Sequence, residues 1–242
     1  MKKVTSLVAV GLLTAASANA VTINEAVMND ISTDSHEFVE LCGSPGESLT
    51  GLTLVLIEGE GATAKGTIDR AIALTGPIPA DGYWVVGDAA VAPDQAQAVD
   101  WIENGGQTIL IVQGFSSSVG TDIDVNNDGI ADGPIGTIID GVGVRLPSDG
   151  DAVYYSAPAL GPDTGDTGTA NFDVAGVVRC VDCTGAWGMI CLNGTEPTGP
   201  GCNTSNAFNP YYVPYASPGL QNTCPPVSVD PNSWGKVKAG YR

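Results

Sequence analysis

The stretch DIDVNNDGIADG, residues 122–133, gathers acidic and amide side chains at regular spacing. Asp124, Asn126 and Asp128 stand at every second position, and Gly129 follows them directly. This Asp-x-Asn-x-Asp-Gly core is typical of calcium loops, because alternate side chains supply oxygen ligands while the glycine permits a sharp turn. Position 12 counted from Asp124 is Ile135 and not the glutamate of an EF-hand. The sequence therefore predicts a calcium loop of the kind found in extracellular β proteins, with ligands from Asp122, Asp124, Asn126, Asp128 and Asp132.

A plain solvated turn is the alternative for this loop, because Asn, Asp and Gly are common in turns for conformational reasons alone. Two features favour the metal. Nearly every polar side chain of the loop carries an oxygen ligand, and neither lysine nor arginine is present to neutralise the charge. Two weaker acidic clusters, SDGDA (148–152) and PDTGD (162–166), would add a ligand if the fold brought them near.

The residues needed for the common catalytic mechanisms do not form a recognisable set. His36 is the only histidine, and we interpret it as an exposed loop residue before a strand. Carboxylate pairs of the glycosidase kind arise by chance among 27 acidic residues, and no phosphate loop or dinucleotide fingerprint is present. We therefore expect a non-enzymatic binding or structural protein. A secreted carboxylate-based hydrolase such as a glycosidase, or a carbohydrate-binding module, is the alternative.

The first twenty residues have the pattern of a secretory signal peptide. Lys2 and Lys3 precede an apolar run over residues 7–13, and Ala18-Asn19-Ala20 is a small-x-small cleavage site. No later stretch reaches the length of a transmembrane helix, so we expect no transmembrane anchor once residues 1–20 are removed. The alternative is an uncleaved anchor. The sequence thus predicts a secreted or cell-surface protein, extracellular or periplasmic, that begins at Val21.

The net charge of −18 limits the classes of molecule that this protein is expected to bind. A surface this acidic repels nucleic-acid phosphates and anionic lipid and attracts divalent cations, so we expect no nucleic acid. An extracellular protein or a cell-surface polymer is the expected kind of partner. Solubility alone is the alternative reason for the charge.

Six cysteines follow the predicted signal peptide, and an even number in a secreted chain favours disulfides over free thiols. The Cys180–Cys183 pair has the spacing of half a zinc site, but no second pair of this kind follows. Six cysteines allow fifteen connectivities. We expect local closure within 180–202 and a bond from Cys42 to Cys224. The full set of predicted disulfide cysteines is Cys42, Cys180, Cys183, Cys191, Cys202 and Cys224.

Many short apolar segments joined by turns predict an all-β fold. Gly and Pro together are frequent, and at least seven strands are expected without βαβ alternation, which favours an antiparallel β-sandwich. One helix is expected at PDQAQAVDWIENGG, residues 93–106, which opens with Pro-Asp and ends at glycine. The expected strands lie in VTINEAVMND (21–30), HEFVELCG (36–43), LTLVLIE (52–58), YWVVGD (83–88), QTILIVQGF (107–115), GTIIDGVGVRL (136–146) and DAVYYSA (151–157).

The regular pattern weakens after Pro158. We expect an irregular insertion over about residues 158–210 that disulfides hold in place, and an extended Tyr- and Pro-rich segment after it. Residues 225–242 form a predicted flexible tail. Trp234, Val237 and Tyr241 would share one face of a short helix there. A frayed terminus and a basic, aromatic recognition peptide remain the two interpretations of the tail.

Five ordered segments resemble the lamin-tail domains of secreted bacterial proteins. They are INEAV, EFVEL, LTGLTL, ADGYWVVGD and SPGLQN, and the resemblance covers residues 21–224. Members of that family carry I-N-E in the first strand, E-F-[VI]-E-L in the second and a closing [ST]-P-G-x-x-N. The resemblance implies an immunoglobulin-like sandwich that acts as a binding or structural module, without catalytic residues. Leu52 stands where many relatives have Trp, and the cysteine-rich stretch 180–202 departs from the family pattern.

Overall fold

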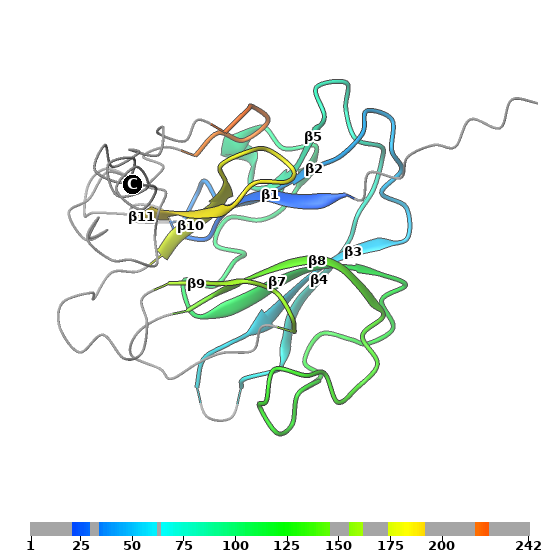
Figure 1. Ribbon diagram of the computed structural model, residues 1–242, viewed down its shortest axis with the longest axis vertical. Coiled ribbons are helices and arrows are strands. Elements are labelled where there is room, and N and C mark those ends of the chain that lie inside the picture. Colours follow the sequence, from blue (N-terminus) through cyan, green and yellow to red (C-terminus); the bar gives the residue numbers. More distant parts are fainter. Residues whose placement is uncertain are drawn as a thin grey trace, which may run out of the picture.

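The computed structural model describes residues 21–29, 34–61, 64–145, 155–161, 174–191 and 216–222. These residues form two β-sheets, which are the upper and lower layers of Figure 1. The predicted signal peptide, the acidic stretches 148–152 and 162–166 and the predicted tail lie outside the described residues. No helix in the described ranges is both long and apolar enough to cross a membrane.

The first sheet has six strands in the order β11-β10-β1-β2-β5-β6. Its neighbouring strands run antiparallel except for the short parallel pair β5–β6. The strands are β1 (Thr22–Val27), β2 (Phe38–Cys42), β5 (Tyr83–Gly87), β6 (Gln95–Ala96), β10 (Val174–Arg179) and β11 (Trp187–Cys191).

The second sheet has five strands in the order β4-β3-β7-β8-β9, and again one edge pair, β8–β9, is parallel. The predicted all-β class is confirmed, although both sheets are mixed and not purely antiparallel. A short 3-10 turn over Ala89–Val91 follows β5. The strands of this sheet are β3 (Leu52–Glu58), β4 (Ile68–Ala73), β7 (Gln107–Gln113), β8 (Thr137–Val144) and β9 (Ala159–Leu160).

The helix expected over residues 93–106 is wrong. This stretch contains the two-residue strand β6 and a series of bends, and Asp100 has a left-handed backbone with φ of 59°. Trp101 and Ile102 are adjacent in sequence, yet both are buried in the main core. The N–H groups of Trp101 and Ile102 donate to the Glu37 carboxylate and not to carbonyls four residues earlier, so the hydrogen bonds of a helix do not form here.

Two further expectations fail in the C-terminal half. Tyr155 and Ser156 lie in a turn with positive φ angles and not in the strand expected at 151–157. Strands β9, β10 and β11 lie in the stretch that was expected to be irregular. β10 pairs with β1 along the register Glu25↔Val178, so this part of the chain completes the first sheet.

The main hydrophobic core lies between the two sheets. Alternate residues of facing strands supply it, such as Val39 and Leu41 of β2 and Leu54 and Leu56 of β3, all of which are buried. Trp101 joins the same cluster from the loop before β7. Burying one such aliphatic side chain stabilises the fold by about 1.5–3 kcal/mol.

A second cluster covers the outer face of the second sheet, which explains the continuous apolar runs of β3 and β7. Val55 and Leu110 point away from the main core and pack with Ile123 and Ile135 of the loop between β7 and β8. Both faces are therefore buried along the middle of these strands, which accounts for apolar residues there without alternation. The acidic loop is held on the sheet by its own isoleucines.

An ion pair crosses between the sheets at a β-bulge of β1. The bulge lies between Ile23 and Glu25. Arg179 of β10 contacts Asp140 of β8 at 2.9 Å and donates through Nε to the Ile23 carbonyl at 2.7 Å. The Ile23 N–H donates to Asp140 Oδ2 at 2.8 Å. The guanidinium also lies 4.2 Å from the centre of the Trp187 ring, so cation–π attraction adds to the pair.

The expected Cys42–Cys224 disulfide is wrong, because Cys42 is bonded to Cys183 with a Cα–Cα distance of 5.3 Å. β10 pairs with β1 beside β2, and this register places the turn after β10 next to the end of β2. Cys180 is also disulfide-bonded. The side chains of Cys191, Cys202 and Cys224 lie outside the described part of the chain.

Replacing Cys42 and Cys183 together by serine should lower the free energy of unfolding by about 5 kcal/mol. The bond closes a loop over a sequence separation of 141, and its main effect is to restrict the unfolded chain. Denaturant unfolding under non-reducing conditions measures the change. An unchanged midpoint with an unchanged slope would show that this bond does not hold the turn onto β2.

Candidate functional site

The acidic loop predicted to bind calcium lies between β7 and β8, over the end of the second sheet. It is tied to the chain before β4 by hydrogen bonds from the Ile123 N–H to the Gly66 carbonyl and from the Ile68 N–H to the Thr121 carbonyl, both 2.9 Å. Asp124 is fully buried. The other predicted ligands, Asp122, Asn126, Asp128 and Asp132, are exposed.

The side-chain oxygens of this loop accept hydrogen bonds from its own backbone. Asp124 accepts from the N–H of Asp128 at 3.1 Å and from that of Gly129 at 2.9 Å. Asn126 Oδ1 accepts from the Asp128 N–H at 3.0 Å, and Asp128 Oδ1 accepts from the Ile130 N–H at 2.8 Å. The contacts of Asn126 and Asp128 are Asx turns, and those of Asp124 reach four and five residues along the loop. Together they form a compact loop without a metal. An ion bound here would use the exposed oxygens, because both oxygens of Asp124 are engaged.

Tyr155 lies against the same loop and was not recognised in the sequence. It is buried in the cluster beneath the loop. Burial raises the pKa of Tyr155, and the nearby carboxylates of Asp124, Asp122 and Asp132 raise it further. The phenol therefore stays protonated beside the acidic loop.

A second acidic group occupies the outer face of the first sheet. Glu25 of β1 and Glu40 of β2 are direct cross-strand neighbours, and both are fully buried. Glu25 accepts from the Ser217 N–H at 3.1 Å. Glu40 accepts from the Gly219 N–H at 2.6 Å and from the Asn24 amide at 2.8 Å. The two glutamates thus bind the segment 216–222, which crosses this face of the sheet (orange in Figure 1).

Asp182, in the turn between β10 and β11, extends this network. Its carboxylate accepts from the Asn24 amide and the Asn222 N–H, both at 3.1 Å, and from the Tyr83 hydroxyl at 3.0 Å. The Asn222 amide donates to the Arg179 carbonyl at 3.1 Å. Four segments that the sequence singled out, INEAV, EFVEL, ADGYWVVGD and SPGLQN, therefore meet in one polar network.

Burial raises the pKa of Glu25 to about 8, and repulsion from Glu40 adds to the shift, although the hydrogen bonds from Ser217 oppose it. Burial likewise raises the pKa of Glu40 to about 7, against the opposing bonds from Asn24 and Gly219. Asp182 and Asp81 add repulsion at Glu40. A shared proton is chemically reasonable here, because two fully charged buried carboxylates in direct apposition repel each other.

Stability should fall as the pH rises from about 4.5 to about 8. In the folded chain the pKa values of Glu25 and Glu40 lie well above 4.5, the ordinary pKa of a glutamate, so both side chains bind protons more tightly there. The folded state holds more protons over this range, so each rise in pH favours unfolding. Melting temperatures measured from pH 4.5 to pH 8, with a chelator present to exclude effects of metal binding, test whether stability falls as the pH rises.

Replacing both glutamates by glutamine should flatten this pH dependence, because glutamine keeps an acceptor oxygen and does not titrate. Some slope will remain, since burial also raises the pKa of Glu58 to about 8. A melting temperature that rises toward pH 8 in the unmodified protein, or a slope unchanged in the double variant, would contradict this assignment.

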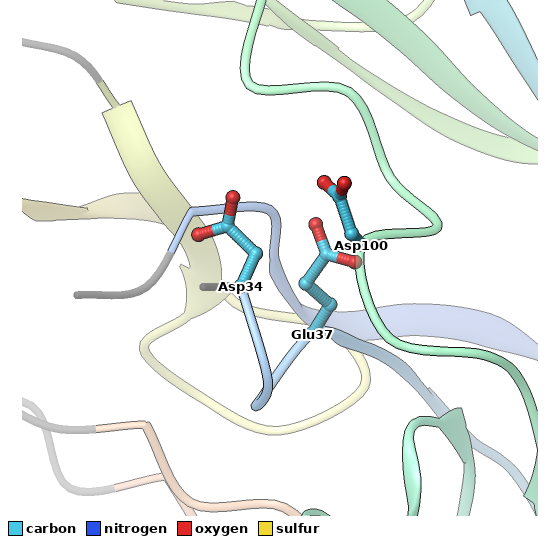
Figure 2. Close-up of side chains that lie close together, drawn as sticks. All are labelled: Asp34, Glu37 and Asp100. Carbon is cyan, nitrogen blue, oxygen red and sulfur yellow. The ribbon is translucent and has the colours of Figure 1, made fainter. Parts of the chain in front are cut away.

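A third acidic group, shown in Figure 2, consists of Asp34, Glu37 and Asp100. Within the described ranges it is the one group of three acidic, histidine or cysteine side chains whose ligand atoms lie within 4.8 Å of one another. The loop 122–132 therefore does not bring three of its carboxylates this close. The spacing of Asp34 and Glu37 is visible in the sequence, but Asp100 lay in the stretch expected to be helical.

Backbone contacts fix Glu37 at the end of the main core. Its Oε2 accepts from the N–H of Trp101 at 2.5 Å and from that of Ile102 at 3.1 Å, whereas its Oε1 is buried without a hydrogen-bond partner. Burial raises the pKa of Glu37 to about 7, against the two backbone bonds and with repulsion from Asp34 and Asp100. His36 lies next to it in the loop before β2 and is exposed, as predicted.

A pocket of about 420 Å³ lies between β8 and residues 155–158. Asp140 is the one acidic residue in its lining, and this carboxylate is engaged by Arg179 and the Ile23 N–H. The pocket therefore does not offer the pair of available carboxylates that a glycosidase needs.

No family model, curated protein or solved structure matches this chain.

Proposed function

We propose that this chain is a secreted, non-enzymatic binding or structural module of the lamin-tail type, with an immunoglobulin-like sandwich and a calcium-stabilised loop. The observation that carries the proposal is the convergence of the motif segments on one polar network. Glu25, Glu40 and Tyr83 come from three strands of the first sheet, and Ser217 and Asn222 come from a segment far along the chain.

This network gives the motif residues a shared structural role. Asn24, Glu25 and Glu40 are buried, and their polar atoms contact the closing segment or the turn that carries Asp182. Such contacts fasten the end of the domain to its first two strands. The motif residues then have a structural role and need not take part in catalysis. This suits a module that binds a partner through its surface.

The Cys42–Cys183 disulfide supports the extracellular part of the proposal, because disulfides persist in oxidising compartments and are rare in the cytosol. The acidic composition supports a partner other than nucleic acid or anionic lipid. An extracellular protein or a cell-surface polymer is the partner that we propose.

A hydrolase would find its best acidic pair in the group of Asp34, Glu37 and Asp100, because these carboxylates lie close together beside His36. We expect the purified protein to give no turnover in a broad screen of glycoside, ester, phosphate and peptide substrates. Reproducible turnover that disappears in Glu37→Gln and persists in the charge-matched control Glu103→Gln would contradict the proposal and show that the protein is an enzyme.

Calcium at residues 122–132 should raise the melting temperature, because a ligand that binds only the folded state adds about 2.7 kcal/mol at one hundred times Kd. The pair Asp122→Asn and Asp128→Asn keeps the oxygens that accept backbone N–H groups and removes two charges. This variant should show a smaller calcium shift than the control pair Asp69→Asn and Asp94→Asn.

The calcium shift is measured by thermal unfolding in chelator and in millimolar calcium. Equal shifts in the loop variant and in the control pair would mean that the loop is only a turn.

A further inference from the structure

We propose that Asp34, Glu37 and Asp100 form a second binding site for a hard divalent cation, with calcium as the ion that fits it best. This site lies where the loop before β7 meets the start of β2, apart from the loop 122–132. It does not depend on the lamin-tail proposal.

The three side chains come from two separate segments and converge. Asp34 and Glu37 precede β2, and Asp100 follows β6. Figure 2 shows the carboxylates of Glu37 and Asp100 close to one another and that of Asp34 to one side of them. One oxygen of each lies within 4.8 Å of one oxygen of the others. Calcium holds its oxygen ligands at about 2.3–2.6 Å, so one ion can contact oxygens that are up to about 5 Å apart.

A second observation, the hydrogen bonding of the Glu37 carboxylate, points to a bound cation at this site. This side chain is fully buried, and its Oε1 has no hydrogen-bond partner although Oε2 has two. A buried acceptor without a partner destabilises the fold, and more so when it is charged. A cation that binds the Glu37 carboxylate through Oε1 would give this oxygen a partner.

The surrounding backbone holds the ligands in place before any ion arrives. The Asp100 N–H donates to the Asp34 carbonyl at 2.9 Å, and the Asn104 amide donates to Asp34 Oδ2 at 2.7 Å. The Glu37 N–H donates to Asp88 Oδ2 at 2.8 Å. Preorganised ligands lose little conformational freedom on binding, which favours affinity.

The chemistry of the ligands selects the class of ion. All three are carboxylates, and the donors to Glu37 are backbone N–H groups and not lysine or arginine. Oxygen-only sites suit calcium, magnesium and manganese and disfavour zinc or copper, which favour imidazole and thiolate. Asp100 is exposed, so an ion and its remaining water ligands have access from that side.

Terbium luminescence tests this site directly, because the Trp101 indole N–H donates to the Glu37 carbonyl at 3.3 Å and so holds the indole near the proposed ion. Terbium replaces calcium at oxygen sites and emits strongly when a nearby tryptophan transfers energy to it. The purified protein, excited where tryptophan absorbs and tyrosine does not, should show terbium emission that added calcium abolishes. Trp101→Phe should remove the emission and leave the number of bound calcium ions unchanged in equilibrium dialysis.

Glu37→Gln should lose both the emission and one bound calcium ion per chain, while Glu103→Gln keeps both. Should Glu37→Gln fail to fold, Asp100→Asn decides, because asparagine tolerates the left-handed backbone at that exposed position. Asp122→Asn with Asp128→Asn should keep the tryptophan-dependent emission, which separates this site from the loop.

The proposal is overturned if the unmodified protein shows no calcium-sensitive emission. It is also overturned if Asp100→Asn, folded by circular dichroism, emits and binds calcium as the unmodified protein does.

Discussion

Buried glutamates on the first two strands or directly before the second hold the irregular parts of this protein to its sheets. Glu25 binds the N–H of Ser217, Glu40 binds that of Gly219, and Glu37 binds those of Trp101 and Ile102. The segments that donate these N–H groups lie outside the strands. A buried N–H that is left without a partner costs about 1–3 kcal/mol, and these carboxyl groups remove that cost. The closing segment and one end of the core therefore depend on three carboxylates.

The same interaction recurs across the molecule and accounts for part of its acidic composition. Asp88 accepts from the Glu37 and Ala90 N–H groups, Asp94 accepts from that of Val85, and Asp124 accepts within its own loop. Turns rich in glycine and proline leave N–H groups without strand partners, and short acidic side chains satisfy them. The cost is electrostatic, because burial and mutual repulsion raise the pKa values of Glu25 and Glu40.

Local patterns predicted much of the fold, and long-range pairing decided the rest. The run LTLVLIE became β3 with the expected bounds, because a short apolar run with β-branched residues favours a buried strand over a helix. The helix prediction for residues 93–106 was wrong because alanines and an opening Pro-Asp are typical of a helix start. In the structure the Trp101 N–H donates to the Glu37 carboxylate, and the stretch is a loop. The spacing of residues 122–128 located a loop with the expected side chains, but most of those oxygens accept local N–H groups. The Cys42–Cys183 bond and the position of Asp100 follow from strand order, which spacing along the chain does not contain.

Amide hydrogen exchange at the four N–H groups bound by the glutamates tests this account most directly. Although they lie outside the strands, the N–H groups of Ser217, Gly219, Trp101 and Ile102 should exchange as slowly as those of β1 and β2. In Glu40→Ala the Gly219 N–H should lose its protection while that of Trp101 keeps it. Exchange of all four at the rate of exposed loop amides would contradict the claim that buried carboxylates fasten these segments to the sheets.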